Sequence, residues 1–591
     1  MKTLLRASLV AAFASGLAAC LIDGEGAPPR SSSRLPPPRF AARGTARAAP
    51  PIAGGTLLAL RGGEAVAAAD PDHDAVWIVP LHEGAPHRVA LHAGDEPGRL
   101  AQDADGQIHV VLRGAGAVAT VDPAGGAVTA RREVCPAPRG IAWDGAASVL
   151  RVACAGGEFV TLPPEGPARS VERLRGDLRD VVAVDGTPVV TTFRAGAVER
   201  LTLTGGRVTA AISVRAVDAA RALAWRAAPA VGGGFVTLSQ RVSSRTLGVP
   251  AAPPPLDGYY GDVGVSAPMA PRIEVSGPGG AIGVDFDVSD GGLAVDVAAA
   301  FDGARWRVAL VSPGWAFGQG VAQAREWTFE PSALPLARPL STRALRVAGQ
   351  AVAVAYTERR ELVVQSRAPG RIVTPTREIA LYDDAVGDAG HDVFHASTAS
   401  GLACASCHPE GGEDGMVWQF ADVGARRTPS LRGGILRTAP FHWDGDLRDM
   451  GALCETVFTA RMGGGALAPA QVQSLGRWLD GLTAPRAPAG DVDAIARGEA
   501  LFRAEGTACA SCHSGPALTN NATAAVGTGR PFQVPSLVGL AYRAPYMHDG
   551  CAATLAARFT DPACGGGDAH GRTSHLTPAQ VDDLVAFLAS R

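Results

Sequence analysis

Apolar and polar residues alternate in short runs over about residues 55–375. Such runs are Gln107–Leu112, Ala117–Val121, Thr187–Phe193 and Ala197–Leu203. A period of two is the pattern of half-buried β-strands. Asp-Gly pairs starting at Asp105, Asp144 and Asp185 precede strand-like runs and are typical of tight turns between paired strands. With almost no helical periodicity, this region is predicted to be all-β.

The β-rich region is also repetitive. Similar units begin at Arg99, Arg139, Arg179 and Arg221, at intervals of 40, 40 and 42 residues; others begin near Leu293 and Leu345, and an earlier one covers 65–91. A period near forty with several short strands is typical of a β-propeller blade. We therefore predict about seven blades over 55–375, with an array of β-sandwiches as the alternative.

A stretch rich in proline and glycine interrupts the repeat at roughly 243–285, and we place it between blades five and six. A loop of this length inside a compact domain is usually functional or covers another surface.

Beyond about residue 385 the pattern becomes helical and occurs twice. In the second copy, Thr577, Pro578 and Gln580 form a capping box ahead of an apolar face at Val581, Leu584, Val585 and Leu588. The first copy has the same face at Val472, Leu475 and Leu479, and each copy opens with a Gly-x-x-x-Phe step at Gly390 or Gly498. Each copy is expected to be a small, mainly α domain, at 385–484 and 490–591.

Each copy contains the pentapeptide Cys-Ala-Ser-Cys-His, at Cys404–His408 and Cys509–His513. C-x-x-C-H is the attachment signature of a c-type haem, in which two thiols bind the haem covalently and the histidine ligates iron. A thiol-redox motif or a zinc knuckle is the alternative, but neither explains the histidine in both copies. The sequence thus predicts two haem c groups, attached at Cys404, Cys407, Cys509 and Cys512, with His408 and His513 as proximal iron ligands.

The first twenty residues have the pattern of an export signal. Lys2 and Arg6 precede a short apolar run that ends at Leu17-Ala18-Ala19-Cys20, which resembles a bacterial lipoprotein signal box. The resemblance implies cleavage after residue 19, lipidation of Cys20 and a Pro-rich tether over 20–54; an ordinary secretory signal is the alternative. Either reading exports the protein to the bacterial periplasm or cell envelope, and Leu21 favours the outer membrane. Anchoring would be by lipid only.

The net charge limits the kinds of partner, and the number of cysteines limits the possible disulfide bonds. A net charge of −3 gives no indication of a nucleic-acid partner. Five cysteines remain after Cys20 and the haem thiols are set aside. Cys135 with Cys154 and Cys551 with Cys564 are candidate disulfides for an exported protein. Cys454 stays unassigned.

Several motifs together resemble the bacterial di-haem cytochrome c peroxidase/MauG superfamily over about 385–591. They are the two C-x-x-C-H motifs, Thr428–Leu431, Phe441–Gly445, Val534–Leu537 and Pro545–Gly550, repeated at an offset of 105 or 106. The resemblance implies a high-spin or weakly ligated first haem, a six-coordinate electron-transfer second haem, and Trp443 between them.

Two departures from that family concern the distal side of each iron. The position of the usual distal ligand of the second haem holds Pro562, so His570, His575 and Met547 are candidates; His570 is favoured because its glycine-rich loop is free to fold over the haem. Where the peroxidases have a glutamate before a Met-Gly pair, this chain has Arg461, which cannot accept a proton at neutral pH. Met462 either ligates the first iron or is a buried residue that only packs in the core.

These observations predict a haem-dependent oxidoreductase of peroxidase/MauG type, in which electrons pass between two haems. Its partner would be a redox protein or a small-molecule oxidant or reductant. One alternative is a non-catalytic electron carrier docked through its propeller, and another is a propeller-based surface binding protein.

Overall fold

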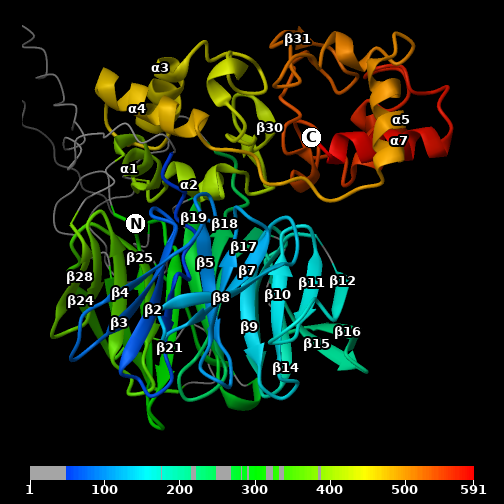
Figure 1. Ribbon diagram of the computed structural model, residues 1–591. Helices are drawn as coiled ribbons and strands as arrows, with labels where there is room; N and C mark the ends of the chain where they lie inside the picture. Colours follow the sequence, from blue (N-terminus) through cyan, green and yellow to red (C-terminus); the bar gives the residue numbers. More distant parts are fainter. Residues whose placement is uncertain are drawn as a thin grey trace, which may run out of the picture.

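The computed structural model describes residues 48–174, 176–214, 221–247, 268–280, 282–288, 292–314, 324–331, 338–383, 388–398 and 400–591. The expected signal peptide, Cys20 and most of the tether lie outside these residues. Within them, no helix has the length and apolar character needed to cross a bilayer. A ring of β-sheets forms one body of the molecule, and two small helical domains lie side by side against one face of the ring (Figure 1).

The ring contains seven antiparallel sheets of four consecutive strands each, which confirms the predicted seven-bladed propeller. Blades one to four comprise β1 (Leu57–Ala59), β2 (Ala65–Asp70), β3 (Ala75–Pro80) and β4 (His87–Ala90); β5 (Pro97–Gln102), β6 (Ile108–Leu112), β7 (Ala117–Asp122) and β8 (Ala127–Glu133); β9 (Pro138–Asp144), β10 (Val149–Cys154), β11 (Glu158–Leu162) and β12 (Ser170–Arg173); and β13 (Leu178–Val184), β14 (Thr187–Thr192), β15 (Ala197–Thr204) and β16 (Arg207–Ser213). Blades five to seven comprise β17 (Ala222–Pro229), β18 (Phe235–Val242), β19 (Met269–Ser276) and β20 (Ile282–Asp287); β21 (Asp296–Phe301), β22 (Trp306–Val311), β23 (Ala324–Phe329) and β24 (Ser341–Leu345); and β25 (Gln350–Tyr356), β26 (Leu362–Arg367), β27 (Gly370–Val373) and β28 (Glu378–Tyr382).

The first strand of each blade lies innermost, and the ring closes where β1 contacts both β25 and β5. The last strand ends at Tyr382, so the sheet continues past the predicted boundary at residue 375. The Asp-Gly turns act as predicted. Asp185 and Gly186 connect β13 to β14 with φ of 49° and 73°, the pair of positive values that a type I′ turn requires.

The Pro/Gly-rich insertion was placed wrongly. β18 ends at Val242 and β19 begins at Met269, and the two strands pair within blade five. The insertion therefore lies inside this blade and not between blades five and six. Leu247, at its start, forms a parallel bridge with Phe420 of the first helical domain, so the described part of the insertion does cover another surface.

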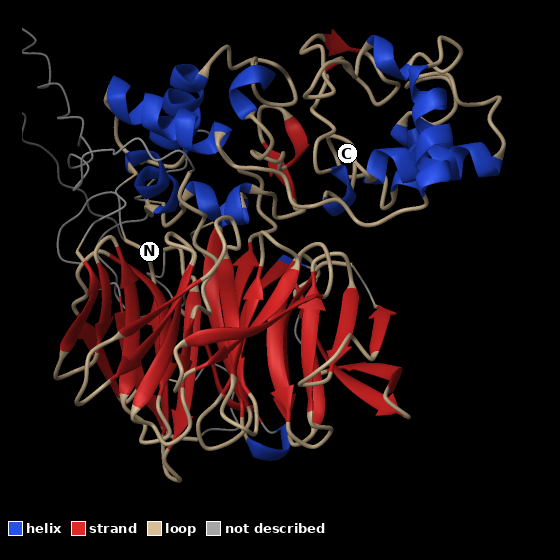
Figure 2. Cartoon of the chain, viewed as in Figure 1, coloured by secondary structure: helices blue, strands red, loops and turns tan. Residues whose placement is uncertain are grey.

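The helical domains follow the duplication. The first contains α1 (Ala389–His395), α2 (Cys404–Cys407), the hairpin β29 (Val417–Phe420) and β30 (Gly424–Arg427), α3 (Met450–Leu453) continuing into a π-helical segment (Cys454–Arg461), and α4 (Pro469–Asp480); the second contains α5 (Val492–Arg503), β31 (Thr523–Ala524), β32 (Phe532–Gln533), α6 (Leu555–Thr560) and α7 (Pro578–Ala589). Short 3₁₀ turns lie at Pro278–Gly280, Pro409–Gly411, Ile435–Thr438, Cys509–Ser511, Leu540–Tyr542 and Pro562–Cys564. In each domain the helix before the C-x-x-C-H motif packs against the last helix, α1 on α4 and α5 on α7 (Figure 2).

Both predicted disulfides are present, joining Cys135 to Cys154 and Cys551 to Cys564. The remaining cysteine, Cys454, is buried in the core of the first helical domain. Burial raises the pKa of its thiol to about 11, so it is a neutral packing group.

The glycine of each Gly-x-x-x-Phe step lies where two helices cross. A Cβ at Gly390 would lie 2.3 Å from the carbonyl oxygen of Ser474 in α4, and a Cβ at Gly498 would lie 1.9 Å from that of Asp583 in α7. Both distances are well inside van der Waals contact, and the obstructing atoms are backbone. The step is therefore a requirement of helix packing around each C-x-x-C-H motif.

Replacing Gly498 with alanine is expected to destabilise the second helical domain by about 2 kcal/mol or more, because α5 must move away from α7. Gly506 is the matched control, since a Cβ there meets nothing within 4 Å and alanine should change stability by no more than about 0.5 kcal/mol. Thermal unfolding of both variants checks this. Equal melting temperatures would contradict the close-crossing explanation.

Candidate haem sites

Each C-x-x-C-H motif forms one wall of a cavity lined mostly by apolar side chains. The first cavity, of about 310 Å³, is lined by Cys404, Cys407 and His408. The second, of about 260 Å³, is lined by Cys509, Cys512 and His513. The cysteines and histidine that a haem c needs thus meet at one enclosed apolar space in each domain.

Both motif histidines are held in the orientation of an iron ligand. His408 Nδ1 donates a hydrogen bond to the carbonyl of Gly412 at 3.2 Å, and His513 Nδ1 donates to that of Leu518 at 3.0 Å. Fixing the Nδ1 proton leaves Nε2 with a free lone pair, the arrangement found for metal-bound imidazole. Burial lowers the pKa of each ring to about 4, so both rings are neutral near pH 7. The residues present therefore fit a haem at both sites.

A second histidine faces His513 across its cavity. The ring centres of His570 and His513 are 6.1 Å apart, with an angle of 30° between the rings. An imidazole nitrogen binds a metal at about 2 Å, so two imidazoles on opposite sides of one iron have centres about 6 Å apart. His570 Nδ1 is buried, and among the described residues it has no hydrogen-bond partner. Burial, with Arg558 and His513 nearby, lowers the pKa of this ring to about 2, so the ring is neutral.

The other two distal candidates differ in position. Met547 also lines the second cavity, and its backbone has a left-handed φ of 73°. His575 is exposed to solvent and does not line the cavity. The geometry thus narrows the three candidates to His570 and Met547, and the imidazole separation favours His570.

Arg461 and Met462 both line the first cavity, as does Trp443. Arg461 lies over the ring of Phe420 at 5.2 Å and pairs with Asp422 at 3.7 Å. Met462 is buried. The sequence-predicted residues are therefore gathered at this cavity, although none of them supplies a proton acceptor.

His442 also lines the first cavity, and our sequence analysis did not identify it. Its Nδ1 lies 3.3 Å from the Asp446 carboxylate, and the hydrogen bond from His442 lowers the pKa of Asp446. His442 matches Met547 in the duplication at an offset of 105, and both have a left-handed φ, 69° and 73°. That correspondence was the available sequence signal. Non-glycine residues with such backbones are concentrated at functional sites.

The two cavities are neighbours that share a wall. Trp443 and Arg427 line both. Trp443 Nε1 donates to the carbonyl of Arg427 at 2.7 Å, and the Arg427 N–H donates to the carbonyl of His548 at 2.6 Å. Trp443 and the Arg427 peptide thus form a hydrogen-bonded part of the wall between the two cavities, to which Gln533, Pro535 and Ser536 also belong.

Buried charge reinforces this wall. Glu413 lies 2.5 Å from the Arg427 guanidinium and 3.7 Å from that of Arg543, and all three side chains are at most 10% exposed. Arg543 lines both cavities as well. Glu413 and Arg427 belong to the first helical domain, and Arg543 belongs to the second. Because a buried charge pair is costly to break, the Glu413–Arg543 pair holds the first domain against the second.

The propeller contributes to the first cavity. Leu247 and Pro268, at the two described ends of the blade-five insertion, line it. The sulfur of Met269, the first residue of β19, lies 4.0 Å from Cys407 Sγ. The first cavity is therefore completed by the propeller, whereas the described residues that line the second all belong to the helical domains.

Comparisons with known proteins found similarity to parts of this chain. The cytochrome c family matches residues 495–591. Hydrazine synthase subunit gamma of Kuenenia stuttgartiensis is 25% identical, over 32% of this chain and 72% of that protein. Among solved structures, Kuenenia stuttgartiensis hydrazine synthase matches at 14% identity with a TM-score of 0.43, covering 58% of this chain and 99% of that one. Virginiamycin B lyase from Staphylococcus aureus matches at 12% identity with a TM-score of 0.36, covering 54% and 91%.

The fold and the matched family define the class of protein. It is a seven-bladed β-propeller followed by a C-terminal cytochrome c domain, which implies haem c and haem-based electron transfer.

Proposed function

We propose that the chain is an exported di-haem c-type oxidoreductase of peroxidase/MauG type. His513 and His570 would hold the second haem, which would supply electron relay, and His408 would hold the first, which would supply reaction with a small oxidant or reductant. The observation that carries the proposal is the unequal pair of adjacent cavities: a histidine faces the proximal histidine at 6.1 Å in the second, while the first is lined by the polar side chains of His442 and Arg461. The resemblance of residues 385–591 to the superfamily supports the type of chemistry.

Haem iron supplies one-electron chemistry and binds small ligands; the chain's own residues orient it and move protons. His442, oriented through Nδ1 by Asp446, would accept and return a proton at Nε2, the role that the family assigns to the glutamate replaced here by Arg461. Arg461 would stabilise negative charge on a bound oxygen atom. Trp443 would lie in the path between the haems.

Low-temperature electron paramagnetic resonance of the ferric protein tests the proposal. We expect two signals of equal intensity, one low-spin from the second haem and one high-spin or weakly ligated from the first. Hydrogen peroxide added to the half-reduced protein should then oxidise the second haem through the first. Two low-spin signals and no reaction with peroxide or carbon monoxide would reject the enzyme.

The position of Met462 favours an electron carrier as the second candidate function. Met462 is buried and lines the first cavity, so it is available to ligate the first iron and close the site. Replacing Met462 with leucine separates the two functions. In a carrier the variant gains a high-spin signal, whereas in the proposed enzyme the spectrum stays unchanged.

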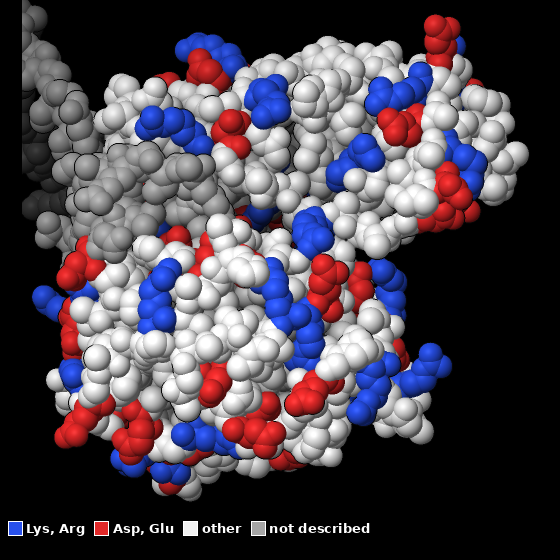
Figure 3. Space-filling view, in the orientation of Figure 1, with Lys and Arg blue, Asp and Glu red and all other residues white. Residues whose placement is uncertain are grey.

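The partner and the location are also proposed. We infer a lipid anchor at Cys20 in the cell envelope, and a soluble redox protein or a small molecule as the electron partner. Charges of both signs are scattered over the face seen in Figure 3. Replacing Cys20 with serine is expected to move the protein from the membrane fraction to the soluble fraction on cell fractionation. Unchanged membrane association would contradict the anchor.

A further inference from the structure

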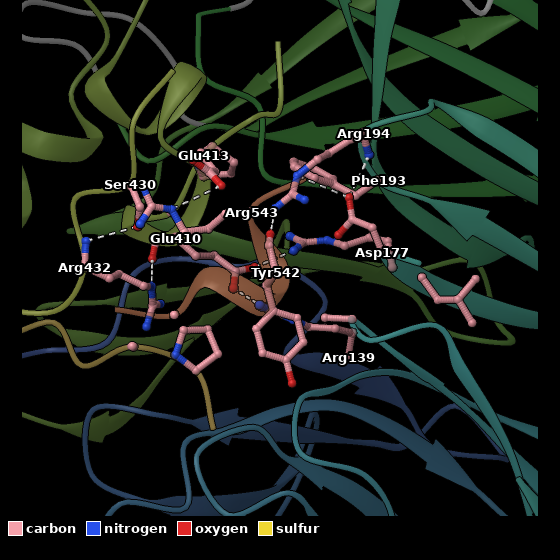
Figure 4. A pocket seen from close by; sticks show the side chains of 18 of the residues that line it. Arg139, Asp177, Phe193, Arg194, Glu410, Glu413, Ser430, Arg432, Tyr542 and Arg543 are labelled. Atoms are coloured by element: carbon pink, nitrogen blue, oxygen red, sulfur yellow. Dashed lines mark hydrogen bonds and ion pairs between the residues drawn. The ribbon is translucent and has the colours of Figure 1, made fainter. Parts of the chain in front are cut away.

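A cavity of about 70 Å³ lies where the propeller meets both helical domains. Figure 4 shows Arg139 and Asp177 from the propeller, Glu410 and Arg432 from the first domain, and Tyr542 from the second around it. Glu410 is only two residues beyond His408 and belongs to the turn Pro409–Gly411. The Glu410 side chain thus connects the loop of the proximal histidine with the propeller.

Three arginines from the propeller converge on the Glu410 carboxylate. Arg179 in β13 lies 2.5 Å from it, Arg113 after β6 lies 3.3 Å away, and Arg139 in β9 pairs with it. The Glu410 side chain is 4% exposed. Three guanidinium groups, which stay protonated at neutral pH, surround this carboxylate, so it is ionised.

Other carboxylates also act electrostatically on these arginines: Glu96 on Arg113 and Arg139, Asp177 on Arg139, and Asp180 on Arg179. Asp180 itself pairs with Arg99 and, at 3.2 Å, with Arg226. Glu410 is the carboxylate with which Arg113, Arg139 and Arg179 all form ion pairs. Arg139 and Arg179 are also the arginines at which the repeat units of blades three and four begin.

The loop that holds Glu410 also orients the imidazole of His408. Arg432 Nε donates to the Glu410 carbonyl at 2.8 Å. Gly411 N donates to His408 O, and Gly412 N to Pro409 O, both at 2.9 Å. The Gly412 carbonyl then accepts the His408 Nδ1 proton. The backbone of Glu410 is left-handed, with φ of 54°, a conformation that persists only where surrounding contacts impose it.

We propose that Glu410 is a positioning residue through which the propeller sets the orientation and the electrostatic environment of the proximal histidine of the first haem. It acts through the His408 loop and has no contact with substrate. This inference rests on the proposed haem at His408, and it gives the propeller a role in tuning that haem's reduction.

The test is spectroelectrochemical titration of the holoprotein, comparing wild type, Glu410→Gln, Arg113→Gln and Asp144→Asn. Removing the negative charge at Glu410 should favour the ferrous state of the first haem. For a charge on the order of 10 Å away, the ferrous-to-ferric equilibrium should change by about tenfold. A tenfold change corresponds to about 59 mV for one electron. Arg113→Gln should shift the same equilibrium the other way. Asp144→Asn is the control, because it breaks a buried pair with Arg151 at 2.9 Å elsewhere in blade three.

We expect opposite shifts of the first haem in the two variants, a changed ferric resonance spectrum for that haem in Glu410→Gln, and an unmoved second haem throughout. An unchanged first haem in both variants would overturn the proposal, leaving Glu410 as a packing contact. If Glu410→Gln does not fold, Arg113→Gln decides alone. A wild-type protein with a single haem would instead refute the proposed di-haem function, so the two failures are distinguishable.

Discussion

Replacing His570 with alanine is expected to convert the second haem from low-spin to high-spin. The ring of His570 is half-buried, neutral and 6.1 Å from that of His513, so it is the imidazole placed to complete the coordination of that iron. Without it, the second haem should bind carbon monoxide, and electron transfer to the first haem should slow strongly. Optical and paramagnetic resonance spectra of the ferric protein measure the change.

His575→Ala is the matched control, since His575 is exposed and lies five residues away in the same sequence segment. It should leave both spectra unchanged. Added imidazole should restore the low-spin signal in His570→Ala by entering the vacated space. A low-spin second haem in His570→Ala without imidazole would show that another residue, with Met547 the first to examine, is the ligand.

Replacing His442 with glutamine is expected to lower the rate of peroxide reduction by about 10²- to 10⁴-fold, the usual contribution of a positioned acid–base group. Glutamine keeps the approximate shape of the side chain but cannot exchange a proton. Haem content and the second haem's spectrum should stay the same. Stopped-flow kinetics measure the loss.

Two companion variants make this result specific. Asp446→Asn should reduce the rate less, since it removes only the group that orients His442 at 3.3 Å. Arg461→Gln should also lower the rate, because it removes the positive charge that would stabilise a negatively charged oxygen atom. A full rate in His442→Gln would contradict the assignment. A new high-spin first haem in that variant would make His442 an iron ligand and favour the carrier.

Local patterns in the sequence predicted most of the fold. The period near forty and the Asp-Gly turns predicted the seven blades, and the Gly-x-x-x-Phe steps and the capping box at Thr577 predicted the paired helices. The insertion was misplaced because it splits blade five between β18 and β19, so two strands that pair in space are separated by a Pro/Gly-rich segment. A period count cannot distinguish a split blade from a gap between blades.

The structure brings the predicted site residues together at two cavities. Local sequence patterns could not predict the contacts between segments that are far apart in the chain. Arg139 and Arg179 were recognised as repeat markers, yet their partner Glu410 lies 271 and 231 residues further along the chain. His442 was overlooked because its duplicate is a methionine, so chemical identity is not preserved there. Only the shared backbone geometry makes the pair evident.

The haem content of the purified protein tests the central claim most directly. Intact mass and the pyridine haemochrome spectrum should give two covalent haems per chain for the wild type. Cys404→Ser with Cys407→Ser, and separately Cys509→Ser with Cys512→Ser, should each give one. A wild-type protein with one haem, retained when Cys404 and Cys407 are replaced, would contradict a first haem site and with it the proposed transfer of electrons between two haems.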